Sequence, residues 1–88
     1  MDIWTFNPGT DQDFLGWLEQ HPDGYVVNID SPASEFGMLH RGRCSHFRGN
    51  GDLKWAEARK VCAETQFMVD RWSREQLGGI PVHCRDCL

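Results

Sequence analysis

Hydrophobic positions spaced three and four residues apart predict a first helix over residues 11–20. Phe14, Trp17 and Leu18 recur at this spacing and give the segment one apolar stripe that can face a core. Thr10 is a suitable N-cap, and acidic residues stand in the first turn, where the positive end of the helix dipole favours them. The pattern therefore predicts an amphipathic helix near the start of the chain.

Residues 25–30 are mostly apolar, with polar residues at the alternate positions Asn28 and Asp30, which is typical of a β-strand. The segment is rich in β-branched and aromatic residues, and turn-forming residues stand before and after it. Residues 36–40 fit an antiparallel partner, so the two segments predict a hairpin. Upstream, the apolar residues of 3–6 form either a short edge strand or a simple cover over the core.

A second strand-and-helix unit follows in the other half of the chain. β character returns over residues 58–64, and helical spacing then continues to about Leu77. Thr65 supplies the N-cap of this second helix, and Gly78-Gly79 is a C-terminal cap signal. Between the hairpin and this unit, residues 43–57 are predicted to form a long loop. The residues expected to be buried on the second helix are Met68, Val69 and Trp72.

Taken in order, these elements predict one α+β domain over residues 1–88. A small, mostly antiparallel sheet of about three strands would be covered by two helices. With 88 residues, one hydrophobic core gives little net stability, so a domain of this size often needs a metal ion or disulfides.

Charge is distributed unevenly along the chain. The net charge is −4, but the first 39 residues hold seven acids and no lysine or arginine. From His40 onward there are nine basic residues against six acids. Such asymmetry produces a local positive surface in spite of the acidic total, unless the charges simply form an ordinary solvated surface.

The expected chemistry of the cysteines depends on the cellular compartment, because the compartment sets whether thiols stay reduced. The N-terminus lacks the basic start and apolar run of a signal peptide, and no segment has the length of a membrane span. We therefore expect a cytoplasmic protein without membrane contact. In a reducing cytosol, a Cys-x-x-Cys motif indicates metal binding or redox chemistry rather than structural disulfides.

Four residues have the spacing of a closed metal site. His40 and Cys44 form a His-x3-Cys pair at the end of the predicted hairpin, and Cys84 and Cys87 form a Cys-x-x-Cys at the C-terminus. One imidazole and three thiolates are a sufficient set for tetrahedral Zn²⁺. The sequence predicts a structural zinc ion that joins the two ends of this small domain.

Other residues compete for a place in this site. Cys62 is the main rival and would replace His40 in a four-thiolate site, but an isolated cysteine in an apolar strand is usually a small buried hydrophobe. His46 and His83 stand close to the predicted ligands in sequence and are weaker candidates. A redox pair of the thioredoxin type opens a helix after a strand, whereas Cys84-x-x-Cys87 follows a helix.

No catalytic set accompanies the metal site. A full set of four protein ligands leaves no open position for substrate or water, as a catalytic zinc ion requires. The chain has no Gly-x-Ser-x-Gly motif and no phosphate-binding glycine motif. We therefore expect that the protein is not an enzyme and has no small-molecule substrate.

Several of these segments together resemble a known family. The residues are His21-Pro22-Asp23-Gly24-Tyr25-Val26-Val27-Asn28, Leu39-His40-x3-Cys44, Lys60-Val61-Cys62-Ala63 and Cys84-x-x-Cys87. They resemble a poorly characterised bacterial zinc-binding module that accompanies a catalytic domain in restriction-type endonucleases and other genome-defence proteins. The resemblance spans about residues 14–87. It implies a metal-stapled accessory domain for nucleic-acid recognition or protein assembly.

Two functions follow from these observations. The first is nucleic-acid binding, in which guanidinium and ammonium groups bind phosphates and aromatic rings stack on bases. The second is a protein-interaction module whose acidic N-terminal half meets a basic partner. The residues predicted to contact nucleic acid are Arg41, Arg43, Arg48, Lys54, Trp55, Arg59 and Lys60, with Phe47 as a further aromatic residue.

Overall fold

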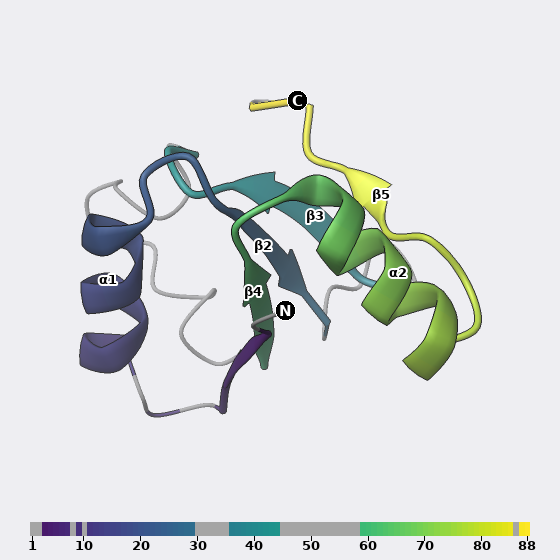
Figure 1. Cartoon of the computed structure of the whole chain (residues 1–88), viewed down its shortest axis with the longest axis horizontal. Coiled ribbons are helices and arrows are strands. Elements are labelled where there is room, and N and C mark those ends of the chain that lie inside the picture. Colours follow the sequence, from purple (N-terminus) through teal and green to yellow (C-terminus); the bar gives the residue numbers. More distant parts are fainter. Residues whose placement is uncertain (1–2, 8, 10, 30–35, 45–58, 86) are drawn as a thin grey trace.

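The computed structural model describes residues 3–7, 9, 11–29, 36–44, 59–85 and 87–88. Thr10, the 31–34 turn and most of the predicted 43–57 loop lie outside these residues. The elements along the chain are β1 (Trp4–Phe6), α1 (Asp11–Gln20), β2 (Tyr25–Asn28), β3 (Met38–Arg41), β4 (Lys60–Ala63), α2 (Gln66–Gln76) and β5 (Val82–His83). Figure 1 shows α1 at the left of the sheet and α2 at its right. The predicted α+β class is confirmed.

The sheet contains five strands in the order β1-β4-β2-β3-β5, rather than about three. Among the described residues, the first four strands pair in antiparallel fashion, and only β3 and β5 run parallel. Of the two interpretations of residues 3–6, the edge strand is the correct one. β5 was not predicted because it has two residues and directly follows Pro81, so it carries no alternating pattern of its own.

The strand register assigns every residue of the sheet to one of two faces. Trp4, Cys62, Val26 and His40 are aligned across β1, β4, β2 and β3, and paired residues point to the same face. The next residues along these strands point to the opposite face because side chains alternate along a strand. The first face packs against α1 and the opposite face packs against α2.

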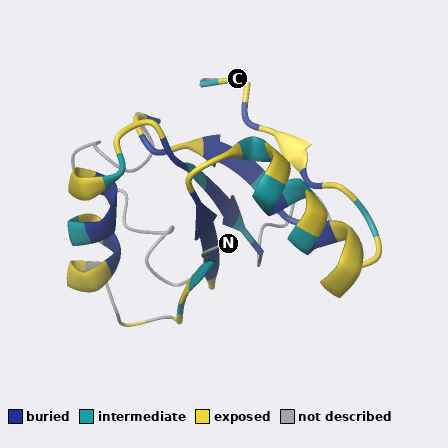
Figure 2. Cartoon of the chain, viewed as in Figure 1, coloured by how far each residue is buried: buried dark blue, intermediate teal, exposed yellow. Residues whose placement is uncertain are grey.

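The core under α1 holds the predicted apolar stripe together with three cysteines. Phe14, Trp17 and Leu18 are buried, and Figure 2 shows the inner side of α1 in dark blue and its outer side mostly in yellow. The stripe of the first helix is therefore confirmed. The buried residues of this cluster are Phe14, Trp17, Leu18, Val26, Cys44, Cys62 and Cys84.

The core under α2 is aliphatic. Val69 is fully buried, and Met68 and Trp72 pack against the same cluster, as the sequence predicts. Thr65 caps the helix by accepting a hydrogen bond from the backbone N–H of Met68 at 3.3 Å. At the other end, Gly78 has a φ of 85° and donates its N–H to the carbonyl of Ser73, which is the predicted glycine cap.

Neither helix is suited to crossing a membrane. In the described part of the chain, no helix combines the length and apolar character that a lipid bilayer requires.

Candidate metal centre

Four predicted ligands come together beside the α1 core. His40 lies on β3, Cys44 follows that strand, and Cys84 and Cys87 lie in the C-terminal segment after β5. Their donor atoms all lie within 4.8 Å of one another. The Sγ of Cys44 is 3.5 Å from the Nδ1 of His40 and 3.8 Å from the Sγ of Cys84. These four residues lie close enough to hold one metal ion.

Two of the six distances between donor atoms have the length of an edge of a tetrahedral zinc site, and all six lie within 4.8 Å. Zinc–sulfur bonds of about 2.3 Å and zinc–nitrogen bonds of about 2.0 Å place two ligand sulfurs about 3.8 Å apart and a sulfur and a nitrogen about 3.5 Å apart. The two distances from Cys44 have these values. No disulfide joins any of the four cysteines of the chain, all of which are described. The spacing of the sulfurs therefore suits a shared cation.

Pairing between β3 and β5 brings the two halves of the site together. The N–H of Val82 donates to the carbonyl of Gly37 at 3.1 Å, and the N–H of Cys84 donates to the carbonyl of Leu39 at 2.9 Å. Gly37 starts this alignment with a φ of 83°, a conformation that favours glycine. A Cβ at this position would also lie 2.7 Å from the carbonyl oxygen of Asn28. Gly37 thus fixes where the edge strand binds.

The turn between His40 and Cys44 rests on the turn that ends α1. The N–H of Cys44 donates to the carbonyl of Arg41 at 3.0 Å, and the N–H of Gly42 donates to the carbonyl of Gly24 at 2.8 Å. A Cβ on Gly42 would lie 3.1 Å from the carbonyl oxygen of His21. The metal turn and the 21–24 turn therefore lie so close together that a side chain at position 42 would require them to separate by a few tenths of an ångström.

Arg43 joins the same two turns from the outside. Its Nε donates to the carbonyl of Pro22 at 3.2 Å, and its Nη2 lies 3.1 Å from the Oδ1 of Asp23. Both side chains of the ion pair are mostly exposed. The bridge connects the two turns, but solvent screens most of its electrostatic energy, so it contributes little to holding the metal turn in place.

Burial and a backbone hydrogen bond act in opposite directions on the pKa of the Cys87 thiol. His40, Cys44 and Cys84 are buried, whereas Cys87 is only partly buried. Burial raises the pKa of Cys87, and the N–H of Arg41, which donates to its Sγ at 3.3 Å, acts in the opposite direction. A bound cation would lower the pKa of Cys87 because it stabilises the thiolate directly.

The rival ligands lie apart from this group. Cys62 is on the same face of the sheet as His40, but β2 with Val26 runs between them, which separates their backbones by about 10 Å. Burial raises the pKa of the Cys62 thiol, as expected for a small hydrophobe in a core. His83 is exposed on β5, with its Nε2 3.5 Å from the Nε2 of Gln66. His46 lies outside the described residues.

The residues that were predicted to contact nucleic acid differ in their exposure to solvent. Arg41 and Arg59 are exposed, and Arg43 is exposed but engaged with Asp23. Lys60 departs from the prediction: it is 1% exposed, and its Nζ lies 5.0 Å from the centroid of the Phe14 ring. It faces the α1 core because β4 is an interior strand, so it is not available to a phosphate. The predicted residues outside the described part are Arg48, Lys54, Trp55 and Phe47.

Arg85 is absent from the predicted set, although it is exposed beside the site. Its position between Cys84 and Cys87 in sequence was the available signal, since any side chain inside a metal-binding Cys-x-x-Cys turn is held next to the metal. Arg41 lies between His40 and Cys44 in the sequence, so its backbone is likewise held close to the predicted metal site.

Comparisons of the chain with protein families, with curated proteins and with solved structures give no match. The resemblance to a restriction-associated zinc module therefore stays a prediction, and the function is argued from the geometry of the metal centre and the charges around it.

Proposed function

We propose that the four residues bind one structural Zn²⁺ ion. The observation that carries this proposal is the pair of distances from Cys44, which match the edges of a tetrahedral site with three sulfur ligands and one nitrogen ligand. Thiolate and imidazole donors in tetrahedral arrangement favour zinc over magnesium or calcium, which prefer oxygen ligands and larger coordination numbers. Bound there, the ion would act as a Lewis acid that keeps the three cysteines deprotonated.

The ion would join the C-terminal segment after β5 to the end of the β2–β3 hairpin. β5 has two residues, both exposed, and it pairs only with β3 at the edge of the described sheet, so a short ladder attaches the C-terminal segment to the sheet. The hydrophobic residues are also split into two clusters on opposite faces of the sheet. In such a domain, the free energy of metal binding is part of the free energy of folding.

Cobalt substitution tests the metal proposal. The protein purified without chelator should contain one zinc ion per chain, and Co²⁺ in its place should give the visible absorption of a tetrahedral site and the near-ultraviolet band of cobalt–thiolate bonds. Cys62→Ala is the matched control and should keep both signals. A reduced, metal-free protein with an unchanged melting temperature and no cobalt spectrum would contradict the proposal.

The same geometry favours a binding role over catalysis. The four side chains lie close enough to fill all four positions of a tetrahedral site, so a metal ion bound by all of them would have no open position for a water molecule or substrate. We therefore propose a non-catalytic module whose metal holds a binding surface in shape.

We further propose that this surface binds nucleic acid. Support comes from the charge distribution: the acids gather in the first 39 residues, whereas all nine basic residues come after them. Arg41 and Arg59 are exposed in the described part of that basic half. The alternative is a protein partner for the acidic half, which the exposed Asp13 and Glu19 on α1 favour.

Salt dependence of binding decides between the two. Labelled duplex DNA, single-stranded DNA and RNA are titrated with zinc-loaded protein at several salt concentrations. Nucleic-acid binding should weaken steeply as salt rises, because each phosphate contact releases condensed counterions. No binding to any of the three at low salt would contradict the nucleic-acid proposal and leave a protein partner as the better interpretation.

A further inference from the structure

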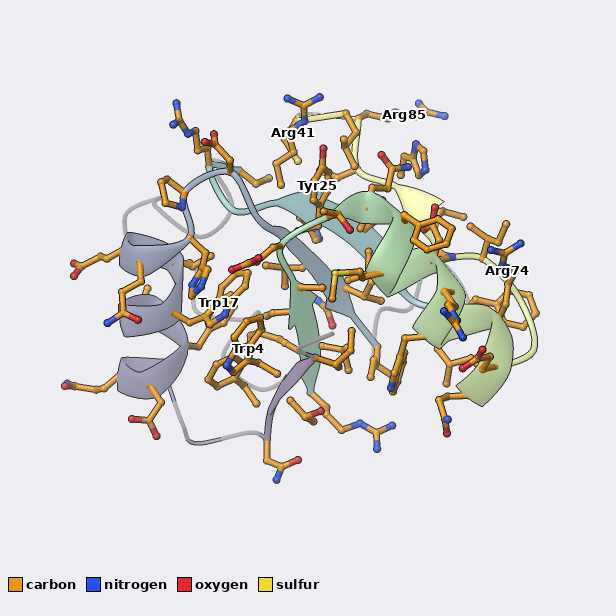
Figure 3. The ribbon with its side chains drawn as sticks, in the orientation of Figure 1. Trp4, Trp17, Tyr25, Arg41, Arg74 and Arg85 are labelled. Atoms are coloured by element: carbon orange, nitrogen blue, oxygen red, sulfur yellow. The ribbon has the colours of Figure 1, made fainter. Side chains whose placement is uncertain are left out.

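We infer that the surface formed by Arg41, Arg85 and Tyr25, here called the knuckle face, is where this domain contacts phosphates. The inference rests on the proposed nucleic-acid function and assigns it a place. Figure 3 shows the three side chains at the same end of the molecule, next to the C-terminal segment.

Two of the three residues are direct neighbours across the sheet. Tyr25 on β2 and Arg41 on β3 are paired in the antiparallel register, so their side chains leave the same face at adjacent positions. Tyr25 is partly buried and packs against the α2 core, whereas Arg41 is exposed. The ring is thereby fixed by packing, and a guanidinium group stands beside it in solvent.

The metal site fixes the position of the third residue. Arg85 lies between Cys84, whose N–H is bound to the carbonyl of Leu39, and Cys87, whose Sγ accepts a hydrogen bond from the N–H of Arg41. The backbone that carries Arg85 is therefore attached to the backbone that carries Arg41 at two points. A bound metal ion would make this attachment rigid, which lowers the entropic cost of presenting two arginines to one ligand.

The charges of the knuckle face are available to a ligand. Within the described residues, the side chains of Arg41 and Arg85 form no ion pair, whereas Arg43 and Arg71 each have a carboxylate at 3.1 Å. Guanidinium groups bind phosphate oxygens with two parallel hydrogen bonds, and a phenol hydroxyl can add a third donor. Two arginines without such a carboxylate among the described residues, beside a tyrosine packed against the α2 core, fit the phosphodiester backbone of a nucleic acid.

A competing role for these arginines is to offset the charge of the metal centre. Zn²⁺ with three thiolates and a neutral imidazole carries one net negative charge. One nearby cation is enough to balance it. The two roles predict different results when the arginines are replaced, so zinc affinity and salt dependence must both be measured.

The test uses the full, zinc-loaded chain and a labelled DNA duplex of mixed sequence. Arg41→Gln and Arg85→Gln should each reduce the slope of log K against log salt by about 0.9, and the double variant by about twice as much. Arg74→Gln is the matched control, because Arg74 is exposed in the last turn of α2 and likewise has no ion pair among the described residues. Its slope should equal that of the wild type.

Zinc affinity, measured by competition with a colorimetric chelator, separates the two roles. Unchanged zinc affinity with a reduced salt slope supports the knuckle face. Weaker zinc affinity with an unchanged slope shows that the arginines serve only the metal centre and overturns the inference. If the wild type binds DNA and both variants bind equally well, the knuckle face is wrong although the proposed function stands. If the wild type does not bind, the proposed function itself fails.

Discussion

The backbone N–H of Arg41 donates a hydrogen bond to the Sγ of Cys87 across 3.3 Å. This contact joins the end of the β2–β3 hairpin to the end of the chain. It lowers the free energy of the thiolate relative to the thiol, and the thiolate is the form that a metal ion binds. The same backbone group positions the Arg41 side chain, so the metal centre and the proposed binding surface share one structural support.

The ligand set predicts a clear hierarchy among cysteine variants. Cys84→Ser should lower the melting temperature sharply or prevent folding, because it removes a buried ligand and with it the binding energy of the metal. Cys62→Ala should cost about 1–3 kcal/mol, the usual range for a core truncation, and should retain the metal. Thermal unfolding followed by circular dichroism, with metal analysis of each sample, checks both results. Metal loss in Cys62→Ala together with metal retention in His40→Ala would show that the ligand set is wrong.

Burial of Cys62 predicts a loss of stability at alkaline pH. Burial raises the pKa of this thiol above its ordinary value of 9.0, so the folded state keeps the proton after the unfolded state has lost it. The contribution is fully present below pH 9 and declines as pH rises above it, with a limiting slope of about 1.4 kcal/mol per pH unit. Urea unfolding of wild type and Cys62→Ala between pH 8 and pH 10 isolates the effect, since the metal ligands are common to both. Parallel pH profiles would contradict it.

Two glycines with the same backbone conformation should respond differently to alanine. Gly37 and Gly78 have φ values of 83° and 85°, but a Cβ on Gly37 meets the carbonyl oxygen of Asn28 at 2.7 Å, whereas a Cβ on Gly78 meets nothing within 4 Å. Gly78→Ala should cost about 1 kcal/mol of conformational strain. Gly37→Ala should cost more, because the backbone must move and the carbonyl that holds Val82 moves with it. Chemical unfolding of both variants measures the difference, and equal losses would show that the close approach is unimportant.

Sequence patterns predicted the local elements well. Both helices were expected from hydrophobic spacing and caps, and α1 (Asp11–Gln20) has the predicted bounds. The group of four residues that lie close enough to hold a metal ion was also predictable, because His-x3-Cys and Cys-x-x-Cys are local spacings. β5 was not, since its two residues become a strand only by pairing with β3. A short strand of this kind depends on contacts between distant segments, which no local pattern encodes.

The role of Lys60 shows a second limit of prediction from local sequence. A lysine beside an arginine suggests a basic surface, and Arg59 is in fact exposed. Lys60 nevertheless lies inside, because β4 is flanked by β1 and β2 and its alternate side chains face the α1 core. Whether a charged residue in a strand is exposed depends on which strands lie beside it, and that order follows from the complete topology.

We expect substitutions at two adjacent residues of the turn between His40 and Cys44 to have different effects. Gly42→Ala should speed zinc release, because its Cβ would lie 3.1 Å from the carbonyl oxygen of His21 and would push the metal turn away from the 21–24 turn. Arg43→Ala removes an ion pair and a hydrogen bond, but both groups of the pair are exposed, so the loss of stability should stay below about 1 kcal/mol. Zinc transfer to a colorimetric chelator gives the release rate of each variant, and urea unfolding gives its stability. If Arg43→Ala releases zinc faster than Gly42→Ala, the exposed ion pair and not the close backbone contact holds the turn in place.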